Sequence, residues 1–361
     1  MKIHLKGYYG YGNFGDDLLM IAAYNLLNEV FIDAKIFIFS KKKYVFNLLP
    51  NAIDIEEIKI ENNDLDLIVY GGGGLYFDFV KGDLKSFILN KTINLFHGDN
   101  VNKIRNYIKK NKKQNTEKIA IGIGVGPYSK TSKKYFNQMR YLSSFKLICV
   151  RDVKSYNFCK RNNKNTYLYS DLVFGQKYWL PIPVEVKKDK DLILFIVRGW
   201  KYSNNELKAE LELAKRLNKN GKKIKFMLFN LEADIKCKKI IERESNFEIL
   251  VYDENNYFFF LEQLKKSSLV ITQRAHGAII ASILGVPTVC LGIEIKLKNI
   301  HLMLKNSSVY FDYPLNTDKM EKIIMDEKYL EKLENNISID IIKNSKAIDE
   351  LVESLKINFN G

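Results

Sequence analysis

Short apolar runs alternate with longer segments of helical periodicity through the first half of the chain. The runs expected to form strands are 2–8, 34–39, 65–70, 118–124 and 147–150. Helical patterns cover 17–29 and the residues that follow Asp152. Strands that alternate with helices in this way are typical of a doubly wound, mostly parallel sheet. The polar stretch 75–117 departs from the alternation, and we expect a helical excursion there.

The second half repeats the alternation after 175–190, a segment rich in Pro, Tyr, Lys and Asp that we expect to be the linker. Its expected strands are 192–197, 223–229, 269–271 and 288–291, and its expected helices are 205–217, 235–243, 257–266 and 278–284. Amphipathic helices over 317–356 close the chain. The pattern predicts an α/β protein in which two Rossmann-like domains face each other across a cleft: 1–176, then 190–316, followed by C-terminal helices over 317–361.

Polar residues gather at the strand ends of the second domain. Arg274 and His276 follow the buried run 269–271, where a strand passes into a small-residue helix, and Lys296 follows the next run. Ligands of open α/β sheets bind at this rim, and a helix N-terminus offers N–H groups and partial positive charge to an anion. A lone Arg or His at a strand end is usually a surface residue or a cap. The apolar flanks favour a functional reading here, because buried charge without a partner is costly.

The bulk composition describes a globular protein and limits its partners. Of the 361 residues, 46% are hydrophobic and 27% charged, and 57 Lys and Arg against 42 Asp and Glu give a net charge of +15. The lysines are spread along the chain with no basic stripe interleaved with aromatics, so nucleic acid is excluded as a partner. The excess charge favours an anionic substrate or contact with an anionic membrane, and a general bias toward Lys, Asn and Ile explains it equally well.

Neither metal, disulfide nor membrane span is expected from the sequence. The four cysteines are scattered, with no C-x-x-C and no histidine at metal spacing. The first residues lack a signal pattern, and the longest apolar stretch, 278–293, contains Pro287 and two glycines. We expect a cytoplasmic protein, either free or peripheral at the inner face of the membrane.

Glycine clusters mark three strand ends of the first domain. Gly10, Gly12 and Gly15 match G-x-G-x-x-G, but the end of the next strand carries 40–43, Ser-Lys-Lys-Lys, where NAD enzymes place an acid. NAD is disfavoured, and NADP stays open as a minor alternative. The runs 71–74 and 122–126 imply a cleft floor of bare backbone.

In chain order, these stretches resemble the motifs of the polysaccharide pyruvyl transferase family. The matching stretches are Gly12-Asn13-Phe14-Gly15-Asp16, 71–74, 122–127, Val150-Arg151-Asp152 with Ser155, Ser170-Asp171, Arg274-x-His276, Gly285-x-Pro287 and Lys296. They run from about residue 7 to 300, so the resemblance spans most of the chain. One departure is Glu294-Ile295 before Lys296, where many relatives carry Asp-Pro.

The resemblance implies a two-domain fold of the GT-B type, with the donor bound by the second domain and the acceptor by the first. The donor would be phosphoenolpyruvate and the acceptor a sugar diol, free or lipid-linked, of a cell-surface glycan; the product is a cyclic pyruvate ketal. Phosphoenolpyruvate carries a phosphate and a carboxylate on three carbons, so several cations should lie close together. We assign the donor to Arg198, Arg274 and Lys296, which follow three strands of the second domain.

His276 is the expected general acid and base, because imidazole titrates near working pH. Asn13 and Asp16 are the expected acceptor contacts; for Asp16 a helix-cap role is equally open. Arg151 and Asp152 are expected to form a structural ion pair. No metal or cofactor is implied.

Three other functions remain open on the sequence. A GT-B nucleotide-sugar glycosyltransferase would use Arg274 and Lys296 to hold a diphosphate, with Glu294 as a candidate ribose ligand. A non-catalytic sugar-binding subunit of a glycan-assembly complex belongs to a different class, although the retained Arg274, His276 and Lys296 speak against it. An NADP oxidoreductase is the third.

Overall fold

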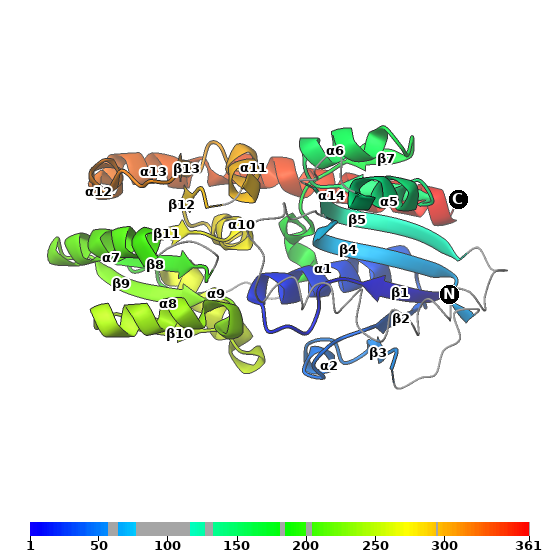
Figure 1. Cartoon of the computed structure of the whole chain (residues 1–361), viewed down its shortest axis with the longest axis horizontal. Coiled ribbons are helices and arrows are strands. Elements are labelled where there is room, and N and C mark those ends of the chain that lie inside the picture. The colour runs from blue at the N-terminus through cyan, green and yellow to red at the C-terminus, as the bar shows by residue number, and fades with distance from the viewer. Residues whose placement is uncertain are drawn as a thin grey trace.

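Two parallel sheets, each flanked by helices, lie side by side along the long axis of the molecule (Figure 1). The computed structural model describes residues 1–56, 64–76, 116–126, 133–180, 185–199, 204–293 and 295–360. The predicted fold class is confirmed. Most of the excursion expected over 75–117, four residues of the expected linker (181–184) and the candidate ribose ligand Glu294 lie outside the described residues.

The first sheet has seven parallel strands in the order β3-β2-β1-β4-β5-β6-β7. Their bounds are β1 Lys2–Lys6, β2 Lys35–Ile38, β3 Ile53–Asp54, β4 Leu67–Tyr76, β5 Glu117–Val125, β6 Leu147–Val150 and β7 Thr166–Leu168. The central strands are continuous apolar runs because helices cover both faces of the sheet. The short edge strands β3 and β7 carry too few residues to give a periodic signal, and the sequence pattern missed them.

The helices of this half are α1 Phe14–Val30, α2 Val45–Leu48, α5 Lys133–Leu142 and α6 Val153–Lys160, followed by the 3₁₀ turns η2 Leu172–Phe174 and η3 Gln176–Tyr178. Helix α1 begins after Asn13, whose Oδ1 accepts a hydrogen bond from the Gly15 N–H at 3.2 Å. The cap of α1 is therefore Asn13, and the alternative cap role considered for Asp16 is wrong; Asp16 and the next residue, Asp17, follow the cap. Both lie within its first turn, where a negative charge complements the helix dipole.

The glycine runs lie inside β4 and β5 rather than after them. A Cβ on Gly72 would come within 2.8 Å of the Leu19 side chain, and a Cβ on Gly122 within 2.4 Å of Leu172. These two glycines also have φ near +65°, a conformation that other residues rarely adopt (Gly72 +69°, Gly122 +62°). They bring α1 and η2 onto the sheet, so part of the expected cleft floor is instead a helix-packing surface.

The second sheet has six parallel strands in the order β10-β9-β8-β11-β12-β13. Their bounds are β8 Leu192–Val197, β9 Lys223–Leu228, β10 Glu248–Val251, β11 Leu269–Thr272, β12 Thr288–Leu291 and β13 Ser308–Phe311. The helices are α7 Asn204–Lys219, α8 Leu231–Glu244, α9 Tyr257–Lys266, α10 Ala275–Ile283, α11 Ile295–Met303, α12 Thr317–Met325, α13 Glu327–Asn335 and α14 Ile337–Asn360, with the 3₁₀ turn η4 Glu254–Asn256.

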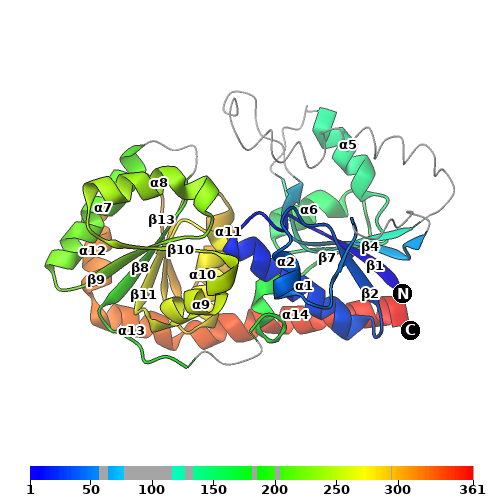
Figure 2. The same cartoon turned by 90° about the horizontal axis from the view of Figure 1, so that it is seen from below.

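The long C-terminal helix α14 returns to the first half (Figures 1 and 2). It packs against α1 and η2, whereas α12 packs against α7 of the second half. Ser345 of α14 donates a hydrogen bond to the carbonyl of Phe174 at 2.9 Å, and the rings of Phe31 and Phe359 lie 5.4 Å apart. The last helix thus ties the two halves together.

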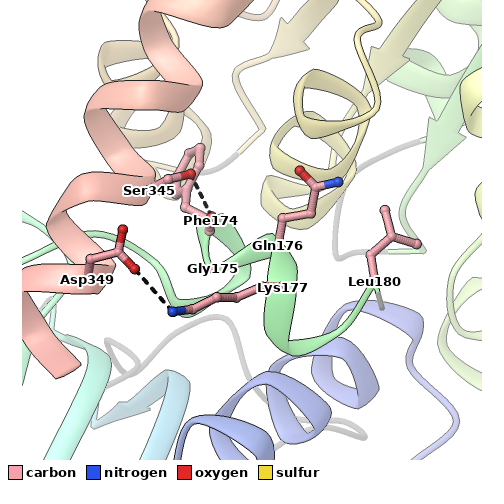
Figure 3. Close-up of a pocket in the computed structure, with 7 residues that line it drawn as sticks. All are labelled: Phe174, Gly175, Gln176, Lys177, Leu180, Ser345 and Asp349. Atoms are coloured by element: carbon pink, nitrogen blue, oxygen red, sulfur yellow. Dashed lines mark hydrogen bonds and ion pairs between the residues drawn. The ribbon is translucent and has the colours of Figure 1, made fainter. Parts of the chain in front are cut away.

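A cavity of about 430 Å³ lies where α14 crosses the segment that links the halves (Figure 3). Its lining residues are Phe174, Gly175, Gln176, Lys177, Leu180, Ser345 and Asp349. The Lys177 amine is 3.4 Å from the Asp349 carboxylate on the cavity wall (Figure 3). None of the predicted site residues lines this cavity.

Candidate functional site

The first turn of α1 is inserted into the second half of the molecule. The Phe14 N–H donates a hydrogen bond to the carbonyl of Phe229 at 3.0 Å. Four rings of the second half surround the fully buried Phe14 ring, with centroids 4.9–5.6 Å away: Phe229, Tyr252, Tyr257 and Phe260. Such aromatic packing favours one fixed arrangement of the rings, so the residues that follow Phe14 are held against the second domain.

A buried carboxylate joins the same two surfaces. The Asp17 carboxylate accepts hydrogen bonds from the hydroxyls of Tyr44 at 2.9 Å and Tyr252 at 3.0 Å. Tyr252 belongs to the second half. Burial raises the pKa of Asp17 to about 7, although both tyrosine hydroxyls oppose the shift.

His276 lies in the first turn of α10, directly against the start of α1. A Cβ on Gly15 would come within 2.3 Å of its Nδ1 atom, so only glycine at position 15 leaves room for the ring. On the other side of the ring, Nε2 is 3.7 Å from the Oδ2 atom of Asp171. That separation exceeds a hydrogen bond, and the buried Nε2 atom has no hydrogen-bond partner among the residues that the structure describes.

Asp171 and Arg151 form a buried ion pair behind His276. Burial by itself would raise the pKa of Asp171, but the Arg151 guanidinium and then His276 outweigh it and hold the pKa below its usual range. The expected pair of Arg151 with Asp152 is therefore wrong. Asp152 instead caps α6 by accepting a hydrogen bond from the Ser155 N–H at 2.9 Å.

Asp16 is the point on which the predicted cations converge. Burial raises the pKa of its carboxyl, and four side chains of the second half oppose that shift: His276, Lys296, Arg274 and Arg198, in decreasing order of effect. The Nδ2 of Asn13 donates a hydrogen bond to Asp16 at 2.6 Å. The structure thus brings together all six residues that the sequence predicted.

Lys296 reaches across to the first sheet from the first turn of α11. Its Nζ atom lies 2.8 Å from the position that a Cβ on Gly74 would occupy. Gly74 therefore leaves space for the amine beside the backbone of β4. Unlike Gly72 and Gly122, this glycine faces the predicted site.

Arg274 is held by groups that sequence reasoning missed. Its Nη2 donates to both oxygens of Asp234 at 2.6 Å, and its Nε donates to the Val197 carbonyl at 3.2 Å. Asp234 is fully buried and also accepts from the Gly199 N–H at 2.7 Å. One edge of the guanidinium is therefore occupied by the protein itself.

A second buried network supports Arg198. The Gln273 Oε1 accepts a hydrogen bond from the Arg198 N–H at 2.6 Å, and its amide donates to Glu210 and to the Tyr313 hydroxyl, the latter at 2.9 Å. Burial raises the pKa of Glu210 to about 7. The strand end that carries Arg198 is thus fixed by Gln273, which follows β11 and is itself held by Glu210 of α7.

Within the ranges given above, no group of three His, Cys, Asp or Glu lies close enough to hold a metal ion. No helix in the described part of the chain is long and apolar enough to cross a membrane.

Comparison with known protein families gives one match over most of the chain. The model of the polysaccharide pyruvyl transferase family matches residues 13–295. No curated protein sequence matches the chain significantly.

Comparison with solved structures supports the two-domain architecture. MnaA of S. aureus in complex with UDP superposes with a TM-score of 0.64 at 12% identity, covering 99% of this chain and 97% of that one. The UDP-GlcNAc 2-epimerase of Neisseria meningitidis bound to UDP-GlcNAc gives 0.60 at 14% identity, with 98% and 99% covered. Anabaena Alr3699/HepE in complex with UDP-glucose gives 0.56 at 12% identity, with 98% and 100% covered. At these identities the likeness shows a GT-B-type fold and does not transfer function.

Proposed function

The chain belongs to the polysaccharide pyruvyl transferase family, a family of transferases, and on that premise we propose that it moves the pyruvyl group of phosphoenolpyruvate onto two hydroxyls of a sugar. The observation that carries the proposal is the convergence of His276, Lys296, Arg274 and Arg198 on Asp16. This arrangement places three fixed cations and an imidazole beside one carboxylate. It suits a small donor with two anionic groups and a reaction that moves protons.

The surroundings of each cation indicate which part of the donor it contacts. Lys296 is a point charge beside the bare backbone of Gly74, which suits the phosphate as it departs. Arg198 extends from a strand end fixed by Gln273. Arg274 shares its charge with Asp234, so it acts on the donor mainly as part of the positive field.

The reaction is an addition followed by an elimination, with His276 and Asp16 handling protons. His276 gives a proton to the methylene carbon, C3, of phosphoenolpyruvate while a sugar hydroxyl forms a bond to C2, and the hydroxyl proton passes to Asp16. The C2–O bond to phosphate then breaks, Asp16 passes its proton to the departing oxygen, and inorganic phosphate leaves against Lys296. The second hydroxyl attacks C2, and its proton returns to His276. The products are the pyruvate ketal and phosphate, with no oxidation or reduction.

Asn13 and Asp16 form the acceptor side of this proposal. The hydrogen bond between them orients both groups. Burial raises the pKa of Asp16, and a carboxylate of higher pKa is a better proton acceptor. The acceptor is a sugar diol of a cell-surface glycan, free or lipid-linked. A lipid-linked acceptor would bring the protein to an anionic membrane surface.

The test combines binding with turnover. Thermal shift of the purified protein with phosphoenolpyruvate, UDP-GlcNAc, UDP-glucose and NADPH in parallel should show stabilisation by phosphoenolpyruvate. Stabilisation by a UDP-sugar alone would favour the glycosyltransferase alternative and overturn the proposal. His276→Ala should abolish phosphate release from phosphoenolpyruvate plus acceptor and keep the wild-type unfolding temperature; retained turnover would remove His276 from the mechanism.

A further inference from the structure

Two tyrosines stack face to face where the first strand of the molecule ends. The rings of Tyr8 and Tyr11 have centroids 3.9 Å apart and planes within 9° of parallel. Both side chains are half-buried. The amine of Lys41 lies 5.3 Å from the centroid of the Tyr11 ring.

This stacked pair lies beside the proposed acceptor residues. Burial and then the negative charge of Asp16 raise the pKa of Tyr8 to about 12, so its hydroxyl stays protonated. Asn13, which donates a hydrogen bond to Asp16 at 2.6 Å, follows Tyr11 by two residues, so the pair adjoins the proposed acceptor residues.

The loop that carries the pair is fixed from two sides. The Tyr11 carbonyl accepts a hydrogen bond from the Nδ2 of Asn230 in the second half at 3.0 Å. The Gly12 N–H donates to the Tyr44 hydroxyl at 2.9 Å. A ligand would meet a preorganised surface and would not have to order the loop.

Lysine side chains border the same loop. Lys41 and Lys42 are both exposed. The backbone at Gly12 has φ of +64°, and a Cβ there would meet the Lys42 amine alone, at 3.9 Å. The backbone at Gly12 is therefore uncovered, and it lies between the two tyrosines and the ammonium groups of Lys41 and Lys42.

We propose that the stacked pair of Tyr8 and Tyr11 is a platform for a sugar ring of the acceptor glycan, which packs on the face of Tyr8 turned away from Tyr11, while Lys41 and Lys42 bind a phosphate carried by that glycan. The apolar C–H face of a pyranose packs on an aromatic ring, and the tyrosine hydroxyls remain available to polar neighbours. The lysines attract phosphate as compact charges. This inference rests on the proposed function for the identity of the acceptor side.

A nucleobase would also stack on an aromatic pair, and the position of the pair favours a sugar. Asp16 and its partner Asn13 offer hydrogen-bonding groups for sugar hydroxyls. The platform is also near the residues proposed to handle protons, where two acceptor hydroxyls have to meet the donor. UMP therefore serves as the competing ligand in the test.

The experiment measures sugar binding without the donor. Saturation-transfer NMR and titration would use the 1-phosphates of glucose, galactose and mannose, their methyl glycosides, and UMP. In the wild-type protein at least one hexose 1-phosphate should bind more tightly than its methyl glycoside and than UMP. The double variant Tyr8→Leu/Tyr11→Leu should weaken that Kd by about tenfold or more, and Lys41→Gln/Lys42→Gln should remove the preference for the phosphate.

The control is a tyrosine–lysine pair at the far edge of the sheet. Lys160 lies 5.5 Å from the Tyr167 centroid, much as Lys41 lies from Tyr11, and Tyr167 is 43% exposed. Tyr167→Leu should leave the Kd unchanged. Binding that survives the loss of Tyr8 and Tyr11, tighter binding of UMP, or no binding of any hexose 1-phosphate would overturn the inference. Binding of phosphoenolpyruvate in the same samples reports separately on the proposed function, which stands or fails independently of these outcomes.

Discussion

His276 Nε2 lies 3.7 Å from the Oδ2 atom of Asp171, although the two residues come from opposite halves of the chain. The same carboxylate oxygen pairs with Arg151. A buried ion pair of the first half therefore lies beside the His276 imidazole. The two halves are joined at the group proposed to transfer the proton.

Asp171→Asn should impair both turnover and stability. The variant leaves the Arg151 guanidinium buried without a counter-charge, which costs about 3–5 kcal/mol. It also removes the negative charge that faces the imidazole, and we expect kcat to fall roughly 10²-fold. Phosphate release and urea unfolding measure the two effects.

The double variant Arg151→Met/Asp171→Leu separates the effect on turnover from the effect on stability. Replacing a buried ion pair with apolar side chains is often neutral for stability, so the double variant should recover most of the lost free energy of unfolding. Its kcat should remain low. A double variant with wild-type kcat would show that His276 needs neither residue.

Gly15→Ala should lower activity with little loss of stability. Position 15 is in the first turn of α1, where alanine is favoured over glycine by up to about 1 kcal/mol. The added Cβ would come within 2.3 Å of the His276 Nδ1 and within 2.9 Å of its Cγ, so the imidazole has to move. We expect kcat to fall at least about tenfold at an unchanged unfolding temperature.

Gly74→Ala gives the graded comparison. Its Cβ would meet the flexible end of Lys296 at 2.8 Å, and the amine can retreat. This variant should mainly raise the KM for phosphoenolpyruvate. Equal effects of both variants on kcat would contradict the separate roles given to His276 and Lys296.

The sequence predicted the two sheets and the strand ends because these depend on local patterns. Strands buried on both faces are continuous apolar runs, and Arg274 and His276 stand out where the run 269–272 ends. The edge strands β3 and β7 were missed because they have only two and three residues, and β10 and β13 were missed because, as edge strands, they are only partly buried and lack a continuous run of buried apolar residues.

Pairings between distant residues were beyond the reach of these local patterns. Arg151 was assigned to its neighbour Asp152. Its partner is Asp171, which follows β7, whereas Arg151 follows the adjacent strand β6. Asp234, which holds Arg274, is one acid among several on an amphipathic helix and carries no local signal. Its complete burial is the feature that distinguishes it, and burial of a single polar residue follows from tertiary packing.

Stability should fall as pH rises from about 4 to 7. Burial raises the pKa values of Asp17 and Glu210 to about 7, while the same groups titrate near 4 in an unfolded chain. In this window the folded protein holds more protons than the unfolded chain, so the free energy of unfolding decreases with pH. The slope is roughly 1.4 kcal/mol per pH unit for each group.

Asp17→Asn and Glu210→Gln should each flatten this dependence. The amides keep a hydrogen-bond acceptor for the neighbouring tyrosines without a titrating proton. Unfolding temperatures measured between pH 4.5 and 8 check the slope, with the exposed Glu262→Gln as a matched control. The prediction fails if the double variant Asp17→Asn/Glu210→Gln shows the same dependence of stability on pH as the wild-type protein.

Phe14→Ala should loosen the joint between the halves and thereby weaken the site. The buried ring contacts four aromatic residues of the second domain, and its removal should cost about 3–5 kcal/mol. Asp16, two residues along the same helical turn, would then no longer be held against the cations of the second half. We expect calorimetry to show the two domains unfolding in separate transitions, with a higher KM for phosphoenolpyruvate. Phe136→Ala, at a ring that is 61% exposed, should change neither measurement. A Phe14→Ala protein that keeps one transition and its KM would mean that Asp16 is held in place by contacts other than the Phe14 ring.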